Sequence, residues 1–80
     1  MSLRGYSLRL FRANQEADSK LIGVQLGRYC ITKDIPVYQI AEKFDVSRMT
    51  IYQWFVGATK PSKERAEKIK ALLEKARFSV

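Results

Sequence analysis

The sequence lacks histidine altogether and contains a single cysteine, Cys30, in 80 residues. One cysteine cannot close an internal disulfide, and without histidine a zinc finger of the cysteine and histidine type cannot form. No run of about 18 apolar residues is present, and the N-terminal residues lack the basic-then-apolar order of a signal peptide. We therefore expect a cytoplasmic protein with no membrane-spanning segment, no metal and no cofactor, which is stabilised by packing alone.

Features that would indicate an enzyme are also missing. The chain has no glycine-rich phosphate loop and no nucleophile elbow, and its eight carboxylates are scattered along the sequence. Eighty residues also leave room for only one small hydrophobic core. We expect a single non-enzymatic domain without a small-molecule substrate.

What the sequence does have is an excess of positive charge. Fifteen Lys and Arg residues oppose eight Asp and Glu residues, which gives a net charge of +7. Residues 47–80 carry eight of these cations and three of the anions, so most of the excess lies in the C-terminal part. A basic surface of this kind favours a polyanionic partner, either nucleic acid or an acidic membrane surface.

Apolar residues recur at the spacing of an amphipathic helix in four segments. The first segment runs from Asp18 or Ser19, either of which could cap the helix, to about Thr32. The second restarts at Pro36, whose missing N–H suits the first turn of a helix, and it ends near Phe44. The break between these helices is therefore expected just before Pro36.

Two further helices follow in the C-terminal half. Ser47 is a good N-cap for the third helix, and Gly57 can adopt the left-handed conformation that ends it. Ser62 is expected to cap the fourth helix, which completes a domain at residues 18–78. Trp54 lies on the apolar face of the third helix, so we expect it in the core.

The N-terminal segment, residues 1–17, shows no helical period. Apolar and polar residues alternate over residues 6–10, which permits a short strand or an extended arm. Three roles stay open for this arm: a flexible tail, an edge strand that pairs with a second subunit, or a minor-groove arm. The last of these would use the side chains of Arg4, Arg9 and Arg12. The pattern as a whole predicts an all-α fold, a four-helix bundle with an extended N-terminal arm.

The second and third helices, with a connection of about three residues, have the arrangement of a helix-turn-helix unit at residues 37–56. Ala41 is small where the two helices approach most closely, and Val46 fills the turn. The shared core of the unit is expected to consist of Ile40, Ile51 and Trp54. This unit resembles the helix-turn-helix of the lambda-repressor-like and Cro-like regulators. The resemblance covers residues 19–77, and it rests on the pattern Ile40-Ala41, Val46-Ser47, Thr50-Ile51, Trp54 and Gly57, followed by Pro61-Ser62.

Two positions depart from the pattern of that family. Asp45 occupies the turn position where the family usually has Gly, although Asp tolerates the left-handed conformation better than most residues. Val37 stands where the family often has a Gln that contacts phosphate. Tyr38 or Gln39 could supply the contact that Val37 cannot.

The resemblance implies that the helix at residues 47–56 lies in the major groove of double-stranded DNA. Arg48 would then donate two hydrogen bonds to guanine, Gln53 would bind adenine, and Met49 and Thr50 would contact a thymine methyl group. The full set of expected base-facing residues is Ser47, Arg48, Met49, Thr50, Tyr52 and Gln53. The expected phosphate contacts, in or just after the following loop, are Lys60, Lys63 and Arg65.

One recognition helix reads only a few base pairs, so the resemblance also implies a homodimer on a near-palindromic site. The function expected on this basis is that of a Cro-like transcriptional repressor of phage or prophage type, with double-stranded DNA as the partner. The alternative is that the same fold serves as a protein-interaction adaptor without specific DNA binding.

Overall fold

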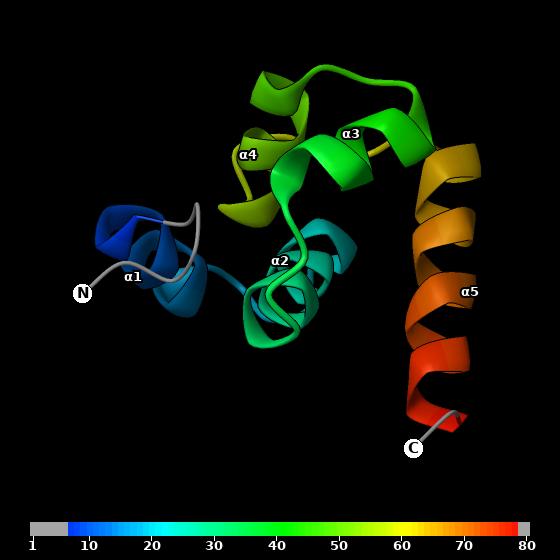
Figure 1. Ribbon diagram of the computed structural model, residues 1–80, viewed down its shortest axis with the longest axis horizontal. Helices are drawn as coiled ribbons and strands as arrows, with labels where there is room; N and C mark the ends of the chain where they lie inside the picture. Colours follow the sequence, from blue (N-terminus) through cyan, green and yellow to red (C-terminus); the bar gives the residue numbers. More distant parts are fainter. Residues whose placement is uncertain (1–6, 79–80) are drawn as a thin grey trace.

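The computed structural model describes residues 7–78, with the side chains of residues 7–76, and all regular structure in this part is helical (Figure 1). Five helices follow one another: α1 (Leu8–Glu16), α2 (Ile22–Thr32), α3 (Val37–Phe44), α4 (Arg48–Phe55) and α5 (Lys63–Phe78). Within residues 7–78, none of these helices has the length and apolar character that crossing a membrane requires.

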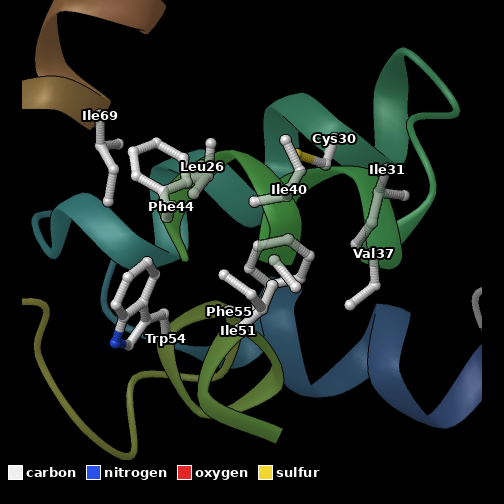
Figure 2. Close-up of a cluster of buried hydrophobic side chains, with 11 residues drawn as sticks. Leu26, Cys30, Ile31, Val37, Ile40, Phe44, Ile51, Trp54, Phe55 and Ile69 are labelled. Carbon is white, nitrogen blue, oxygen red and sulfur yellow. The ribbon is translucent and has the colours of Figure 1, made fainter. Parts of the chain in front are cut away.

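Helix α2 occupies the centre of the molecule. It contacts α1, α4 and α5, and α3 packs against α4. Helices α1 and α5 lie on opposite sides of α2 (Figure 1). Figure 2 shows the resulting core, in which side chains from α2, α3, α4 and α5 meet. Leu26, Ile51, Phe55 and Ile69 in this cluster have no exposed surface.

The contact between α2 and α4 is close because α2 carries glycine where the two helices meet. A Cβ atom added at Gly23 would lie 2.8 Å from the carbonyl oxygen of Trp54 and 2.9 Å from its Cβ. Real Cβ atoms essentially never come this close to another heavy atom. Glycine at this position therefore lets the backbone of α2 approach α4 directly.

The number of helices differs from the expected four, because residues 8–16 form a helix where an extended arm was expected. Ser7 caps α1 by accepting a hydrogen bond from the N–H of Leu10 (3.0 Å). Leu10 and Phe11 pack against the core, whereas Leu8 is 46% exposed. The inner face of α1 also includes the polar Asn14, so the apolar residues alone show no helical period. The part of the expected arm that includes Arg4 and Tyr6 lies outside the described residues.

The predicted start of α2 is also wrong. This helix begins at Ile22, and its N-cap Leu21 provides no side-chain hydrogen bond. The carboxylate of Asp18 instead accepts a hydrogen bond from the N–H of Lys20 (2.9 Å), which stabilises the turn between α1 and α2. The predicted end of α2 at Thr32 and the predicted end of α3 at Phe44 are confirmed.

Candidate functional site

The turn between α3 and α4 is built around a residue in the left-handed conformation. Asp45 has φ 55° and ψ 49°, as expected for a position where Gly is more usual. The N–H of Asp45 donates to the carbonyl of Glu42 (3.2 Å), and the N–H of Val46 donates to the carbonyl of Ala41 (3.0 Å). These bonds satisfy carbonyl groups at the end of α3, so the chain can reverse direction within three residues.

Helix α4 then begins with the side-chain cap that the sequence predicts. The Oγ atom of Ser47 accepts a hydrogen bond from the N–H of Thr50 (3.2 Å). The hydroxyl groups of Ser47 and Thr50 are also within hydrogen-bonding distance of each other (3.0 Å). The first turn of α4 is therefore held in place by two side chains that were expected to face a ligand.

The inner face of α4 anchors the helix in the core. Ile51, Trp54 and Phe55 are buried, and Trp54 is only 3% exposed. The indole ring of Trp54 meets the ring of Phe44 edge to face, with 6.1 Å between ring centroids and 75° between planes. Figure 2 shows Trp54 and Phe44 within the same cluster. The prediction that Trp54 is a core residue is confirmed.

The opposite face of α4 is open to solvent. Ser47, Arg48 and Met49 are exposed, and Met49 is 65% exposed although its side chain is apolar. Tyr52 and Gln53 are partly exposed. Thr50 is partly exposed as well, so all six expected base-facing residues of α4 retain access to solvent.

The three cations expected after α4 differ in their surroundings. Lys60 and Lys63 are exposed. Arg65 is partly buried, and its Nε–H donates to the carbonyl of Phe44 at the end of α3 (3.2 Å). This bond fixes α5 to α3 and uses one of the five N–H donors of the guanidinium group.

The cations around α4 are not neutralised by nearby carboxylates. An exposed ion pair joins Lys68 and Glu64 on α5 (3.9 Å), away from α4 in the sequence. Among the residues whose side chains the structure describes, no carboxylate lies within ion-pair distance of Arg48, Lys60 or Lys63. Their positive charges are available to an anionic ligand.

The second departure from the family pattern, Val37, is explained by its place in the core. Val37 is 6% exposed and belongs to the core, so it makes no surface contact. Its neighbours Tyr38 and Gln39 are exposed, and Tyr38 is 52% exposed. Both of these side chains lie on the first turn of α3, where the sequence places the substitute contact.

The cysteine on α2 is a core residue. Cys30 has no exposed surface and lies in the core cluster (Figure 2). Desolvation raises the pKa of its thiol to about 12. The thiol is therefore protonated at neutral pH and behaves as a small apolar group.

Sequence reasoning missed Asn14 and Arg28, which join α1 to the rest of the molecule. Asn14 is fully buried and bonds to both α2 and α4, and Arg28 bonds to the end of α1. The only signal in the sequence was indirect. A polar residue among Leu10, Phe11 and Ala17 interrupts the apolar face of a short helix, and single polar residues of this kind are normally read as exposed.

Comparisons with known proteins agree with this geometry. A protein-family model described as Helix-turn-helix matches residues 28–76. This segment contains α3, the turn, α4 and most of α5, together with the second half of α2. Helix α1 lies outside it. Searches of curated proteins and of solved structures gave no match.

Proposed function

Since the chain belongs to the helix-turn-helix family of lambda-repressor-like and Cro-like proteins, we propose that it binds double-stranded DNA sequence-specifically and regulates transcription. The observation that carries this proposal is the outer face of α4. Arg48 and its neighbours are exposed there, while the cap at Ser47 and the buried Trp54 hold the helix rigid.

In this proposal α4 lies in the major groove with its first turns against the base edges. Arg48 donates two hydrogen bonds to guanine, and Gln53 both donates to and accepts from adenine. Each bidentate pair of this kind contributes about 1–3 kcal/mol of discrimination between bases. Met49 and Thr50 contact thymine methyl groups, for which the exposed apolar surface of Met49 is well suited.

Phosphate contacts flank the recognition helix. Lys60 and Lys63 lie just after α4, and both are exposed without a carboxylate partner among the described residues. Tyr38 and Gln39 are exposed at the start of α3, and either one takes the place of the phosphate-contacting Gln that the family often has. Arg65 contributes through the donors that Phe44 does not use. These contacts add affinity that depends on salt and is independent of base sequence.

The protein acts as a homodimer and as a repressor in this proposal. A single recognition helix reads only a few base pairs, so two copies on half-sites about 34 Å apart supply the remaining specificity. Occupation of a promoter by this domain would block polymerase, and repression is therefore the mechanism proposed.

One observation favours a second function, that of a protein-interaction adaptor. Met49 is 65% exposed and Tyr38 is 52% exposed, and Met and Tyr are both enriched at protein interfaces. The net charge of +7 favours the DNA-binding function instead.

Selection from a pool of random-sequence duplexes tests the proposal. The wild-type protein is expected to enrich a near-palindromic motif whose half-sites are about one helical turn apart. The same selection with a short basic peptide of equal net charge serves as the control for purely electrostatic retention. If the protein enriches no motif beyond this control, the DNA-binding proposal is wrong and the adaptor function becomes the better explanation.

A further inference from the structure

Asn14 joins three helices through one buried side chain. It lies on α1 and has no exposed surface. Its Nδ2 group donates one hydrogen bond to the carbonyl of Val24 in α2 (3.1 Å) and a second to the carbonyl of Phe55 (2.7 Å). Phe55 is the last residue of α4. Because both amide protons are used, a flipped amide would place its oxygen against two carbonyl oxygens, and the orientation of the side chain is fixed.

The C-terminal end of α1 is also fixed to α2. The Nη2 group of Arg28 donates to the carbonyl of Gln15 (3.1 Å) and lies 3.4 Å from the carbonyls of Asn14 and Ala17. Carbonyl groups in the last turn of a helix have no partner within the helix, so a cation there both satisfies them and complements the helix dipole. Arg28 therefore holds α1 in the position from which Asn14 reaches α4.

The point where Asn14, Gly27 and Phe55 meet is also closely packed. A Cβ atom added at Gly27 would lie 2.5 Å from Nδ2 of Asn14 and 2.9 Å from Cγ of Phe55. The backbone of α2 thus sits directly against the two groups that meet at the end of α4. A displacement of α1 toward α2 at this point would press Asn14 against the backbone of α2 and the ring of Phe55, because proteins are closely packed.

We infer that α1 is a positioning element for the recognition helix and that Asn14 is the positioning residue through which it acts. This inference rests on the proposed DNA-binding function. The N-terminal end of α4 is fixed by the Ser47 cap and by the turn from α3, and its C-terminal end is fixed by Asn14. Helix α1 lies outside the segment that matches the family, so it adds a support that the matched segment does not contain.

The consequence concerns specificity more than general affinity. Gln53 and Tyr52 lie in the C-terminal half of α4, so loss of the Asn14 bonds shifts these side chains relative to the base edges. The cations that contact phosphate lie elsewhere and keep their charge. Binding to a specific duplex is therefore expected to weaken while binding to random duplex and the dependence on salt stay the same.

The test uses the full-length chain with Asn14→Leu, which keeps a similar side-chain volume but removes both donors. Affinity is measured by fluorescence anisotropy for the duplex that the wild type selects and for random duplex, at a temperature where circular dichroism shows each protein folded. Asn14→Leu is expected to bind the selected duplex about tenfold more weakly, equivalent to about 1.4 kcal/mol. Its affinity for random duplex and its salt slope are expected to match the wild type.

A matched control separates positioning from simple loss of stability. Leu72→Ala removes a partly buried side chain on α5, on the far side of α2 from α1 (Figure 1), and is expected to leave both affinities unchanged. Arg28→Lys, which keeps the charge, loosens α1 with Asn14 intact, and it decides the question if Asn14→Leu does not fold. It is expected to lower specific affinity in the same direction.

Two results would overturn the inference while the DNA-binding proposal stands. One is that Asn14→Leu and Arg28→Lys have the same ratio of affinity for the selected duplex to affinity for random duplex as the wild type. The other is an equal loss in Leu72→Ala, which would mean that stability alone is responsible. If the wild type itself prefers no duplex, the proposed function fails before any variant is compared, and the inference fails with it.

Discussion

Two exposed cations, Arg48 and Lys63, are alike in charge but different in their proposed tasks. Arg48 lies on the first turn of the recognition helix, whereas Lys63 lies at the start of α5. Arg48→Ala is expected to weaken binding to the selected duplex by about 1–3 kcal/mol and to relax selection at one base position. Competition with duplexes that carry single base changes measures both effects. Unchanged affinity for the selected duplex would remove Arg48 from the base-reading set.

Lys63→Ala is the matched counterpart, because it likewise removes one exposed positive charge. It is expected to weaken binding to all duplexes by a similar factor and to reduce the slope of log affinity against log salt by about one. The fold is expected to be unaffected, since the side chain is exposed. A loss that varies with duplex sequence would show that Lys63 does more than contact phosphate.

The buried thiol of Cys30 leads to a prediction of how the free energy of unfolding depends on pH. Burial raises the pKa of its thiol to about 12, so the folded protein keeps this proton while the unfolded chain releases it near the ordinary value. The free energy of unfolding therefore falls as pH rises above about 9, and the loss from about pH 8 to about pH 10 is about 1 kcal/mol. Urea unfolding at both pH values measures it.

The variant Cys30→Ala provides the control for this prediction. It is expected to be less stable than the wild type at about pH 8 because it leaves a cavity. Its additional loss between about pH 8 and about pH 10 is expected to be smaller than that of the wild type by about 1 kcal/mol. Equal losses in the two proteins would show that other groups cause the alkaline effect.

At the scale of the element, the capping of α4 determines how well the recognition helix is formed. Ser47→Ala removes the hydrogen bond to the N–H of Thr50 and is expected to lower the free energy of unfolding by about 1 kcal/mol. Urea unfolding measures this change. Ser19→Ala is the control, since the Ser19 hydroxyl forms no hydrogen bond among residues 7–76. If both variants unfold alike, the Ser47 cap does not stabilise α4.

The turn before α4 allows a second prediction, this time of increased stability. Asp45 has a left-handed conformation, which costs an L-residue about 1–2 kcal/mol and costs Asp less. Asp45→Gly relieves this strain, although Gly also gains entropy in the unfolded chain, so a rise of at most about 1 kcal/mol in unfolding free energy is expected. Asp45→Ala is expected to be less stable than the wild type. Calorimetric melting that ranks Ala above Gly would contradict this explanation of the turn.

The ends of α4 could be predicted because the residues that cap this helix are neighbours in the sequence. Ser47 and Gly57 mark the ends of α4, and the structure confirms both, with Gly57 at φ 78°. Helix α1 has a local cap at Ser7, but it was not predicted because the polar Asn14 interrupts its apolar face, and its packing depends on bonds from Asn14 and Arg28 to distant parts of the chain. The base-facing residues of α4 could be proposed from the resemblance to the helix-turn-helix family. The bond from Arg65 to α3 could not, since it depends on how α5 crosses the end of α3.

For the whole molecule, α2 connects the parts on which the proposed function depends. It contacts α4 directly, holds α1 through Arg28, and packs against α5. The recognition helix is therefore supported by one central helix and by α1, while its outer face stays free. This arrangement fixes the face of α4 that we propose reads DNA bases relative to α1 and α2.

Fluorescence anisotropy of the wild-type protein, with its selected duplex and with random duplex across a salt series, tests the proposed sequence-specific DNA binding most directly. Non-specific binding is typically only about 10⁻⁴–10⁻⁶ M at physiological salt. The proposal predicts that the selected duplex stays bound at least about a thousandfold more tightly than random duplex at about 150 mM salt. Equal affinities that decline together as salt rises would contradict it, because they would reduce the basic surface to a sequence-independent electrostatic patch.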